Sequence, residues 1–304
     1  MTAPASIDLP ETDFAKSEGF WTTTIRRLIR HPIGRIGVVI VSILVFMAIF
    51  GPLISPYDPN EIDFSNRFSA PTLSHPFGTD DFGRDILSRV FYGARISLLV
   101  GVIAVSIGGI LGTFLGLIAG YTTRRWVDEI IMRAMDILFA FPAILLAIAI
   151  LAALGKGIAN AMIAIGLVYT PIFARIARGA VLSVRNEEYV TAARALGTRT
   201  HLILLRHILP NSLAPLIVET SLSLAFAILA EAALSFFGLG TQPPDPSWGR
   251  MLSEGRSYFQ QSIWMALFPG LAIMFSVMAF NFLGDGLRDA LDPKMKQMLE
   301  MRGK

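Results

Sequence analysis

Six long, mainly apolar runs dominate this sequence. They occupy residues 36–54, 96–121, 137–155, 157–174, 213–239 and 263–284. An α-helix of ~20 apolar residues crosses a bilayer core about 30 Å thick, and each run is near that length. The chain is 53% hydrophobic and only 16% charged, which is more apolar than one soluble core needs. The sequence therefore predicts an all-α membrane protein with six transmembrane helices.

The ends and the cysteine content narrow the class further. The N-terminus is polar and then basic, and no small-residue cleavage pattern follows the first apolar run, so we expect a retained first helix. The 304 residues include no cysteine, which excludes disulfides and cysteine-based metal sites.

The distribution of positive charge predicts the orientation. If the N-terminus is cytoplasmic, 19 of the 26 Lys and Arg residues lie on the inner side and seven lie on the outer side. This bias favours both termini inside. The tryptophans fall beside the ends of the runs, where we expect them at the headgroup level. They are Trp21, Trp126, Trp248 and Trp264.

These runs divide the chain into five segments. We expect a cytoplasmic N-terminal segment with an interfacial helix, a first transmembrane helix, an external loop with a surface helix, a core of five transmembrane helices, and a cytoplasmic tail. Their bounds are 1–35, 36–54, 55–94, 95–289 and 290–304, with a cytoplasmic loop at 185–212 inside the core. In the first segment, Arg26, Arg27 and Arg30 suit anionic lipid headgroups, or serve only as a topology anchor.

A glycine repeat marks the second run. Gly108, Gly112, Gly116 and Gly120 recur at every fourth residue, so they share one helix face. Such a face lets another backbone approach closely. The repeat predicts helix packing, either within the chain or with a partner chain.

Two carboxylates fall inside the fifth run, and intramembrane carboxylates are functional candidates. Glu219 lies at about the depth of Arg175 and Arg178, so we expect a structural ion pair there. Glu231 lies nearer the outer face with no cation at its depth. It either faces a water-filled path or pairs with a partner subunit.

The sequence contains no visible catalytic centre. It lacks the GxxxxGK[ST] phosphate loop, the HExxH zinc pair and the GxSxG nucleophile elbow. The four histidines lie outside the runs, which argues against a histidine proton relay in the membrane. The acidic stretch GTDDFGRD, 78–85, does not match a calcium loop, so we expect turn formation and helix capping by Asp81 or Asp85.

The longest inner loop is polar and reads as a two-helix hairpin. Residues from Glu188 to Leu196 favour a helix, and Gly197 ends it because glycine adopts the left-handed conformation freely. A second helix starts near Thr198, and Pro210 breaks it. Small side chains suit docking into another protein's cleft. The candidate docking residues are Glu188, Tyr189, Ala192, Ala193, Leu196, Gly197, Leu209 and Pro210.

This loop carries a specific resemblance. TAARALG, nine residues and then HILP resemble the cytoplasmic signature loop of permease subunits in bacterial ABC importers. The stretches HPFGTDDFGRDILSRV, LSFFGLGTQPPDPSWG and FNFLGDGLRDALDPK are similar to C-type permeases of the dipeptide, oligopeptide and nickel importers. Nearly the whole chain is covered. Two departures are Thr191, where the motif has glutamate, and His207, where it has isoleucine.

The resemblance implies a type I ABC importer permease fold in the bacterial inner membrane. It implies a heterodimer with a second homologous permease, two cytoplasmic ATPase subunits, an extracytoplasmic substrate-binding protein, contact with membrane lipid and no nucleic-acid partner. ATP and Mg would be bound by the ATPase partners, with no cofactor and no catalysis in this chain.

The implied cargo is a di- or oligopeptide, with glutathione, nickel complexes or oligosaccharides as alternatives. A proton-coupled secondary transporter using Glu219 or Glu231 is the alternative of another class.

Overall fold

The computed structural model describes residues 20–291, and residues 1–19 and 292–304 lie outside the description. Most of the expected N-terminal segment and of the cytoplasmic tail therefore lie outside the described residues. Within 20–291 the regular structure is helical, and five helices are long and apolar enough to cross a membrane. They are α2 (Pro32–Ile54), α3 (Ile86–Tyr121), α6 (Ile158–Val184), α10 (Leu213–Phe236) and α12 (Trp264–Leu291).

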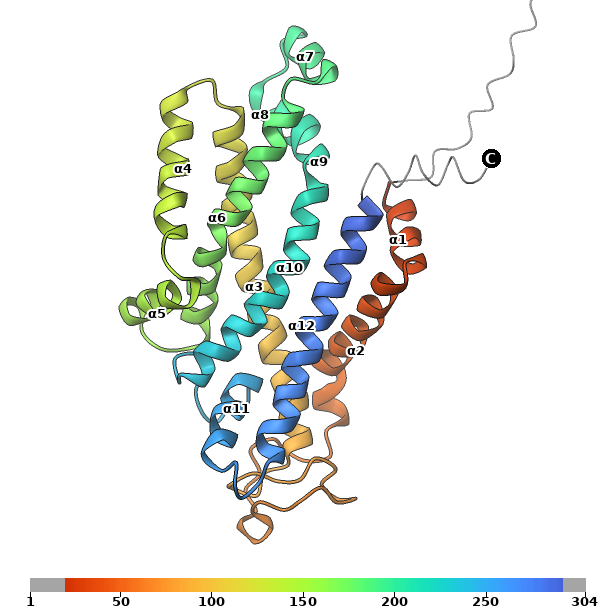
Figure 1. Ribbon diagram of the computed structural model, residues 1–304, viewed down its shortest axis with the longest axis vertical. Helices are drawn as coiled ribbons and strands as arrows, with labels where there is room; N and C mark the ends of the chain where they lie inside the picture. Colours follow the sequence, from red (N-terminus) through yellow and green to blue (C-terminus); the bar gives the residue numbers. More distant parts are fainter. Residues whose placement is uncertain (1–19, 292–304) are drawn as a thin grey trace, which may run out of the picture.

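The remaining expected span is broken. Helices α4 (Arg125–Phe139) and α5 (Ala143–Leu154) meet at a bend of 95°, and in Figure 1 α5 lies at the edge of the bundle, turned away from the direction of α4. The prediction of one straight helix over 137–155 is therefore wrong. The break falls at Phe141 and Pro142, because proline has no N–H to donate and disfavours helical geometry in the residue before it.

Helix α3 is longer than the sequence analysis predicted. Its 36 residues extend about 54 Å at ~1.5 Å per residue, so the expected separate surface helix is its first part. Asp85 caps this helix, since its Oδ2 atom accepts the Ser88 N–H at 2.8 Å. The capping role expected for Asp85 is confirmed.

Short helices complete the chain. The helix α1 (Phe20–Arg30) packs against α12 and buries Thr24 and Leu28, while Ile25 and Ile29 stay exposed. The other short helices have the bounds η1 (Phe64–Asn66), α7 (Glu188–Ala195), α8 (Thr200–Ile203), η2 (Leu204–Ile208), α9 (Leu209–Asn211) and α11 (Trp248–Ser257).

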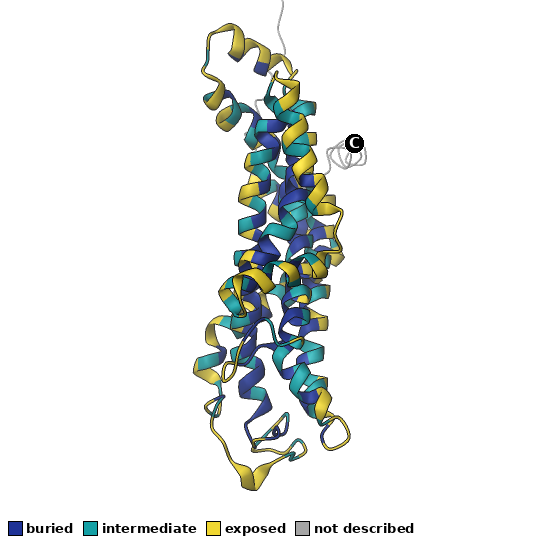
Figure 2. Ribbon diagram, turned by 90° about the vertical axis from the view of Figure 1, so that its left-hand side faces the viewer, coloured by how far each residue is buried: buried dark blue, intermediate teal, exposed yellow. Residues whose placement is uncertain are grey.

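The buried core follows the contacts of α3 with α6 and of α12 with α2 and α10. Figure 2 shows this buried strip running along the middle of the bundle. Trp248 is fully buried, and its Nε1 atom donates to the Val90 carbonyl oxygen at 3.0 Å. The ring of Trp248 is therefore enclosed by protein, and its expected position at the headgroup level stays a prediction.

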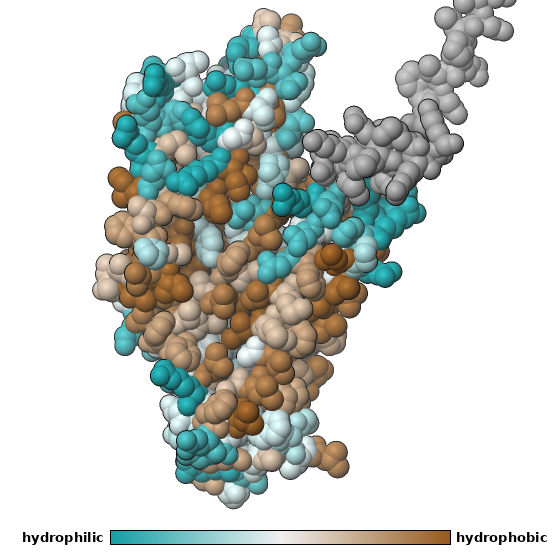
Figure 3. All heavy atoms as spheres, in the orientation of Figure 1, coloured by the Kyte–Doolittle hydropathy of each residue, from teal (hydrophilic) through white to brown (hydrophobic). Residues whose placement is uncertain are grey.

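The two ends of the molecule differ. Helices α7 and α8 form one end, and α11 lies towards the other end, near the loop that precedes α3 (Figure 1). Between them, hydrophobic residues form a broad band across the visible face, with hydrophilic residues gathered above and below it (Figure 3). This pattern suits a protein whose middle lies in lipid.

A buried charge network fixes the end that holds α11. Arg89 is 1% exposed, and its Nη2 atom lies 3.4 Å from Glu254 Oε2 on α11. Arg84 contacts the same oxygen at 3.4 Å and bonds Asp80 through Nε at 2.6 Å. These ion pairs connect the loop before α3 to α11, and they were not predicted from the sequence.

Candidate functional site

The polar loop forms a hairpin whose turn is closed by backbone hydrogen bonds. Gly197 has φ +74°, its N–H donates to Arg194 O at 3.0 Å, and the Thr198 N–H donates to Ala193 O at 3.1 Å. These two bonds are the pair found in a Schellman C-cap. The expected end of the first helix at Gly197 is confirmed, and the turn is a defined structure.

The tip of this hairpin exposes an apolar side chain. Leu196 is 85% exposed, and Tyr189 is 42% exposed. Figure 2 shows that most of the hairpin surface is exposed. An exposed leucine at the end of a rigid turn suits insertion into a cleft of another protein.

The alanines of the hairpin do not all face outward. Ala192 is exposed, but Ala193 is only 7% exposed and packs with Val190, Ile203 and Ile208. Ala193 is therefore part of the hairpin's own small core. The expected outward-facing contact at Ala193 is corrected by this burial, and the exposed surface belongs to the residues around Leu196.

The second limb of the hairpin, residues 200–211, is helical along its length. Residues 204–208 form a π-helical turn, and Pro210 lies in the first turn of α9, directly after it. The helical run ends at Asn211, one residue after Pro210, so the expected break before the fifth span is confirmed beside this proline. The chain reaches α10 after the single residue Ser212, so the hairpin is joined closely to the membrane-spanning part.

The first limb of the hairpin, α7, is also joined to its membrane-spanning helix, α6, by a short connection. Three residues separate Val184, the end of α6, from Glu188, the start of α7. Arg185 Nη1 donates to the Gly120 carbonyl oxygen of α3 at 2.9 Å, and Arg194 lies over the Tyr121 ring at 5.6 Å. The hairpin is thus attached to the ends of both α3 and α6.

The four repeating glycines of α3 face α6 within the same chain. A Cβ on Gly108 would lie 2.8 Å from the Gly166 carbonyl oxygen, and one on Gly120 would lie 2.7 Å from Val181 Cβ. Gly112 and Gly116 meet the backbone of Thr170 and Ala174 in the same way. Of the two alternatives, the structure has packing within the chain.

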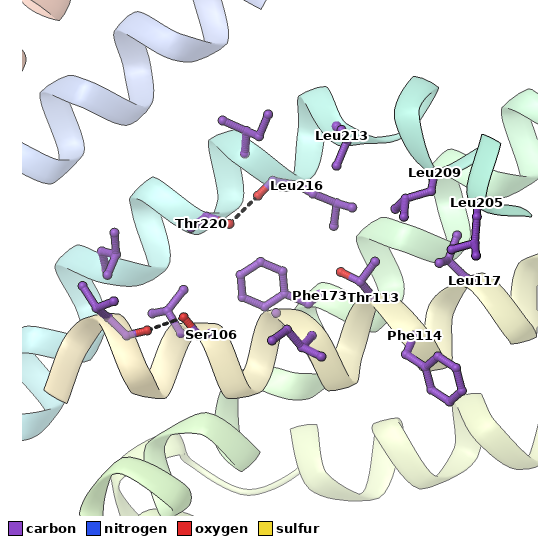
Figure 4. Close-up of a pocket in the computed structure, with 16 residues that line it drawn as sticks. Ser106, Thr113, Phe114, Leu117, Phe173, Leu205, Leu209, Leu213, Leu216 and Thr220 are labelled. Carbon is purple, nitrogen blue, oxygen red and sulfur yellow. Dashed lines mark hydrogen bonds between the residues drawn. The ribbon is translucent and has the colours of Figure 1, made fainter. Parts of the chain in front are cut away.

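A groove of about 540 Å³ opens between α3 and α10 (Figure 4). It extends from the middle of the bundle to Leu205 and Leu209 of the hairpin, and none of its lining side chains is ionisable. Ser106 and Thr220 donate their hydroxyl protons to carbonyl oxygens of their own helices at 2.7 Å. The groove therefore offers an apolar surface to whatever contacts it.

The ion pair expected for Glu219 is absent from the contacts that residues 20–291 make. Glu219 accepts a hydrogen bond from Ser223 Oγ at 2.8 Å, and Arg175 Nη2 donates instead to Asp136 Oδ1 of α4 at 2.7 Å. Arg178 binds Asp128, also on α4. Neither aspartate was predicted from the sequence, although their place on the amphipathic helix α4 is a usable signal.

Glu231 neither faces water nor lies on an outer surface of the described chain. It is 1% exposed, and its two carboxylate oxygens accept hydrogen bonds from Ser97 Oγ at 3.0 Å and Ser235 Oγ at 2.7 Å. Thr241 Oγ1 lies 3.5 Å from the same oxygen as Ser235. Neither alternative predicted for Glu231 describes this hydroxyl-lined site, which joins α3 and α10 to the segment before α11.

No group of three or more His, Cys, Asp or Glu side chains within residues 20–291 is arranged to hold a metal ion. The candidate site consists of a protruding hairpin and the helices that carry it.

Comparison with known families agrees with this architecture. Residues 112–297 match the model of the binding-protein-dependent transport system inner membrane component, and residues 19–71 match the N-terminal transmembrane domain of oligopeptide transport permease C. The chain belongs to this permease family. It is a C-type ABC importer permease and a multi-pass inner-membrane protein.

Two similar proteins extend over almost the whole permease. The dipeptide transport system permease protein DppC of Alkalihalophilus pseudofirmus is 51% identical over 97% of each chain. The glutathione transport system permease protein GsiD of Escherichia coli is 48% identical over 91% of each chain.

Solved structures support the fold of the permease. Two inward-facing crystal forms of the MetNI methionine ABC transporter match with TM-scores of 0.55 and 0.53, each at 17% identity. Both cover 66% of this chain and 95% of the compared chain. The similarity shows a shared fold.

Proposed function

We propose that this permease is the translocating subunit of an ATP-driven importer of di- or oligopeptides. The relatives support a peptide cargo, because one is named for dipeptides and another for glutathione, which is itself a tripeptide. Import of glutathione alone, of nickel complexes or of oligosaccharides by the same machinery is the alternative within the class.

The proposed assembly has five chains. This permease pairs with a second homologous permease, two ATPase subunits bind at the cytoplasmic side, and a substrate-binding protein docks at the outer side. Both termini lie in the cytoplasm, as the excess of Lys and Arg favours. ATP and Mg bind only to the ATPases, and this chain contributes no catalytic group.

The observation that carries the proposal is the exposed Leu196 on a turn fixed by two backbone hydrogen bonds. A rigid apolar tip can enter a cleft on an ATPase subunit and stay there while that subunit moves. Because the two limbs join α6 and α10 almost directly, closure of the ATPases would displace these helices. This displacement would alternate access between the two sides.

The test is uptake by the reconstituted complex. Proteoliposomes contain both permeases and both ATPases, with binding protein, a labelled dipeptide outside and ATP inside. We expect uptake that requires ATP and binding protein and that persists when an ionophore collapses the proton gradient. Uptake that follows the gradient and ignores ATP would overturn the proposal in favour of a secondary transporter.

A further inference from the structure

The helix α4 is attached to the rest of the described chain with little buried packing. Of its 15 residues only Met135 is buried within residues 20–291. Large apolar side chains of α4 stay exposed, which are Trp126, Ile130, Ile137 and Phe139. In Figure 1 it stands at the edge of the bundle beside α6. Packing alone therefore does little to set where α4 lies.

Two ion pairs join α4 to α6. Arg178 donates through Nε and Nη2 to the two oxygens of Asp128, both at 2.6 Å. Arg175 Nη2 donates to Asp136 Oδ1 at 2.7 Å, and its guanidinium lies 4.2 Å from the centre of the Phe139 ring. A two-point arginine–carboxylate contact fixes the angle between its partners as well as their distance.

The spacing of the pairs fixes the direction of α4. Asp128 and Asp136 are about 12 Å apart along the helix at ~1.5 Å per residue. Their arginines lie three residues apart on α6, so the side chains converge from α4 onto one face of α6. Two separated attachments prevent α4 from pivoting, which a single attachment would allow.

The two ion pairs link the helix that leads to the hairpin with the helix that leads to α5. On one side, α6 is three residues from α7 of the hairpin. On the other side, α4 leads through residues 140–142 into α5. A displacement of α6 therefore reaches α5 through α4 if the ion pairs hold.

We infer that the Asp128–Arg178 and Asp136–Arg175 pairs make α4 and α5 move with α6, so that hairpin motion is transmitted to the broken span. This inference rests on the proposed function, because it assigns the hairpin a driven motion. Asp128 and Arg178 are positioning residues in this account, since they contact each other and neither ATP nor cargo.

A movement of α5 would change a cavity in the middle of the molecule. A cavity of about 190 Å³ lies between α5, α6 and α10, and Ile144 of α5 and Phe226 of α10 are among its lining residues. A shift of α5 relative to α10 changes the width of this cavity. The ion pairs thus connect a hairpin at one end of the molecule with a cavity wall in its middle.

The experiment compares variants within the reconstituted complex. Asp128→Asn and Arg178→Gln each remove the two-point contact, and Asp128→Arg combined with Arg178→Asp restores opposite charges in exchanged positions. The matched control is Glu129→Gln, which removes the exposed pair of Glu129 with Arg125 within α4 itself. Assembly, ATP hydrolysis and dipeptide uptake are measured on the same preparations.

We expect the single variants to assemble and to hydrolyse ATP while moving at least about tenfold fewer peptides per ATP. The exchanged pair should recover a large part of this ratio, and Glu129→Gln should match the wild type. A role limited to stability would lower assembly and leave the ratio unchanged.

A distance measurement tests the motion directly. Spin labels are placed at Ile130→Cys on α4 and Ser183→Cys on α6, both exposed, in a chain with no other thiol. We expect one narrow α4–α6 distance with and without trapped ATP, and a broadened distribution in Asp128→Asn.

Two results would overturn the inference. One is a wild-type α4–α6 distance that changes between the two states, and the other is an unchanged peptide-to-ATP ratio in Asp128→Asn. Single variants that fail to assemble and are not rescued by the exchanged pair also count against it. Failure of the proposed function is distinguishable, because the wild-type complex itself would then show no ATP-dependent uptake.

Discussion

Gly112 of α3 lies so close to Thr170 of α6 that a methyl group on Gly112 would overlap the Thr170 carbonyl oxygen. Gly109, three residues earlier on the same helix, has space, because its added Cβ would lie 3.7 Å from the Phe173 ring. The two glycines therefore separate the effect of helix propensity from the effect of packing.

Gly112→Ala should destabilise the permease by about 1–3 kcal/mol, because overpacking forces the two helices apart. Gly109→Ala should be neutral or slightly stabilising, since alanine is the better helix former by about 1 kcal/mol. Thermal unfolding of the two purified variants in the same detergent measures the difference. Equal melting temperatures would show that the α3–α6 contact tolerates separation.

Leu196→Asp should preserve the fold and weaken binding of the ATPases. The side chain is 85% exposed, so its replacement disturbs nothing inside the chain, whereas a lost central contact costs about 2 kcal/mol, or roughly thirtyfold in affinity. Copurification of ATPase subunits with the variant is the measurement. Full recovery of the ATPases would remove Leu196 from the interface.

Ala193→Asp is the informative comparison on the same helix. Ala193 is buried against Val190 and Ile203, so a carboxylate there should unfold the hairpin itself. We expect faster proteolysis between residues 185 and 212 in this variant than in the wild type, and no such increase in Leu196→Asp. Equal protease resistance would contradict the inward orientation of Ala193.

The isolated permease should neither bind nor hydrolyse ATP, because its sequence contains no GxxxxGK[ST] loop to hold the phosphates. Hydrolysis by the purified chain is compared with hydrolysis by the complete complex in the same assay. Turnover that survives removal of every ATPase subunit would show that this chain has its own nucleotide site.

The charge network near α11 should make stability depend on pH through Asp81. Burial and then the neighbouring Asp80 carboxylate raise the pKa of the Asp81 carboxyl. The folded chain therefore holds this proton more tightly than the unfolded chain. The protonated Asp81 carboxyl therefore contributes to the free energy of unfolding below the ordinary aspartate pKa of about 4. This contribution is lost as the pH rises through the raised pKa of the folded chain.

Asp81→Asn removes this loss, so the variant should melt at a higher temperature than the wild type at neutral pH and at the same temperature in acid. Asp80→Asn is the opposite case, because Asp80 bonds Arg84 Nε at 2.6 Å and its removal should cost about 1–3 kcal/mol. The measurement is the difference in melting temperature between the wild type and Asp81→Asn at acidic and at neutral pH. If this difference is the same at both pH values, the account of Asp81 is contradicted.

The sequence predicted most of the fold because its strongest signals are local. Apolar length located the spans, glycine spacing located the close-packed face, and Gly197 located the turn. The break before α5 was missed although Pro142 is visible, because the apolar run continues through it without interruption. The burial of Trp248 was not predicted, because a tryptophan beside a helix end can face either the headgroups or the protein interior.

The polar contacts could not be predicted because they join distant parts of the chain. Arg178 and Asp128 are 50 residues apart in sequence, and depth along a span does not reveal which neighbouring helix supplies the partner. The same holds for Glu231, whose hydroxyl partners come from α3, from α10 and from the loop after α10. Only the packing of three segments makes them neighbours.

The hydrogen bonds around Glu231 run in a fixed direction. Ser97 Oγ lies 3.4 Å from the Trp248 N–H, and Ser235 Oγ accepts the Thr241 N–H at 3.1 Å. Since each serine oxygen faces a backbone donor, each hydroxyl proton is directed at one carboxylate oxygen of Glu231. The carboxylate thus completes two chains of hydrogen bonds that begin at the backbone before and at the start of α11.

Glu231→Gln replaces one of these acceptor oxygens with an NH₂ group, which is a hydrogen-bond donor. This NH₂ group would face a serine hydroxyl whose proton also points at it, so the two donors cannot bond each other. One buried hydrogen bond is lost, so we expect a destabilisation of about 1–3 kcal/mol. Glu219→Gln is the matched control on the same helix, because Glu219 is half-buried with a hydrogen bond from Ser223, and its cost should stay within about 0.5 kcal/mol. Thermal unfolding of both variants, with proteolysis of the segment from 240 to 262 as a local readout, decides the matter. If Glu231→Gln melts like the wild type and leaves that segment protected, Glu231 does not hold the start of α11 in place.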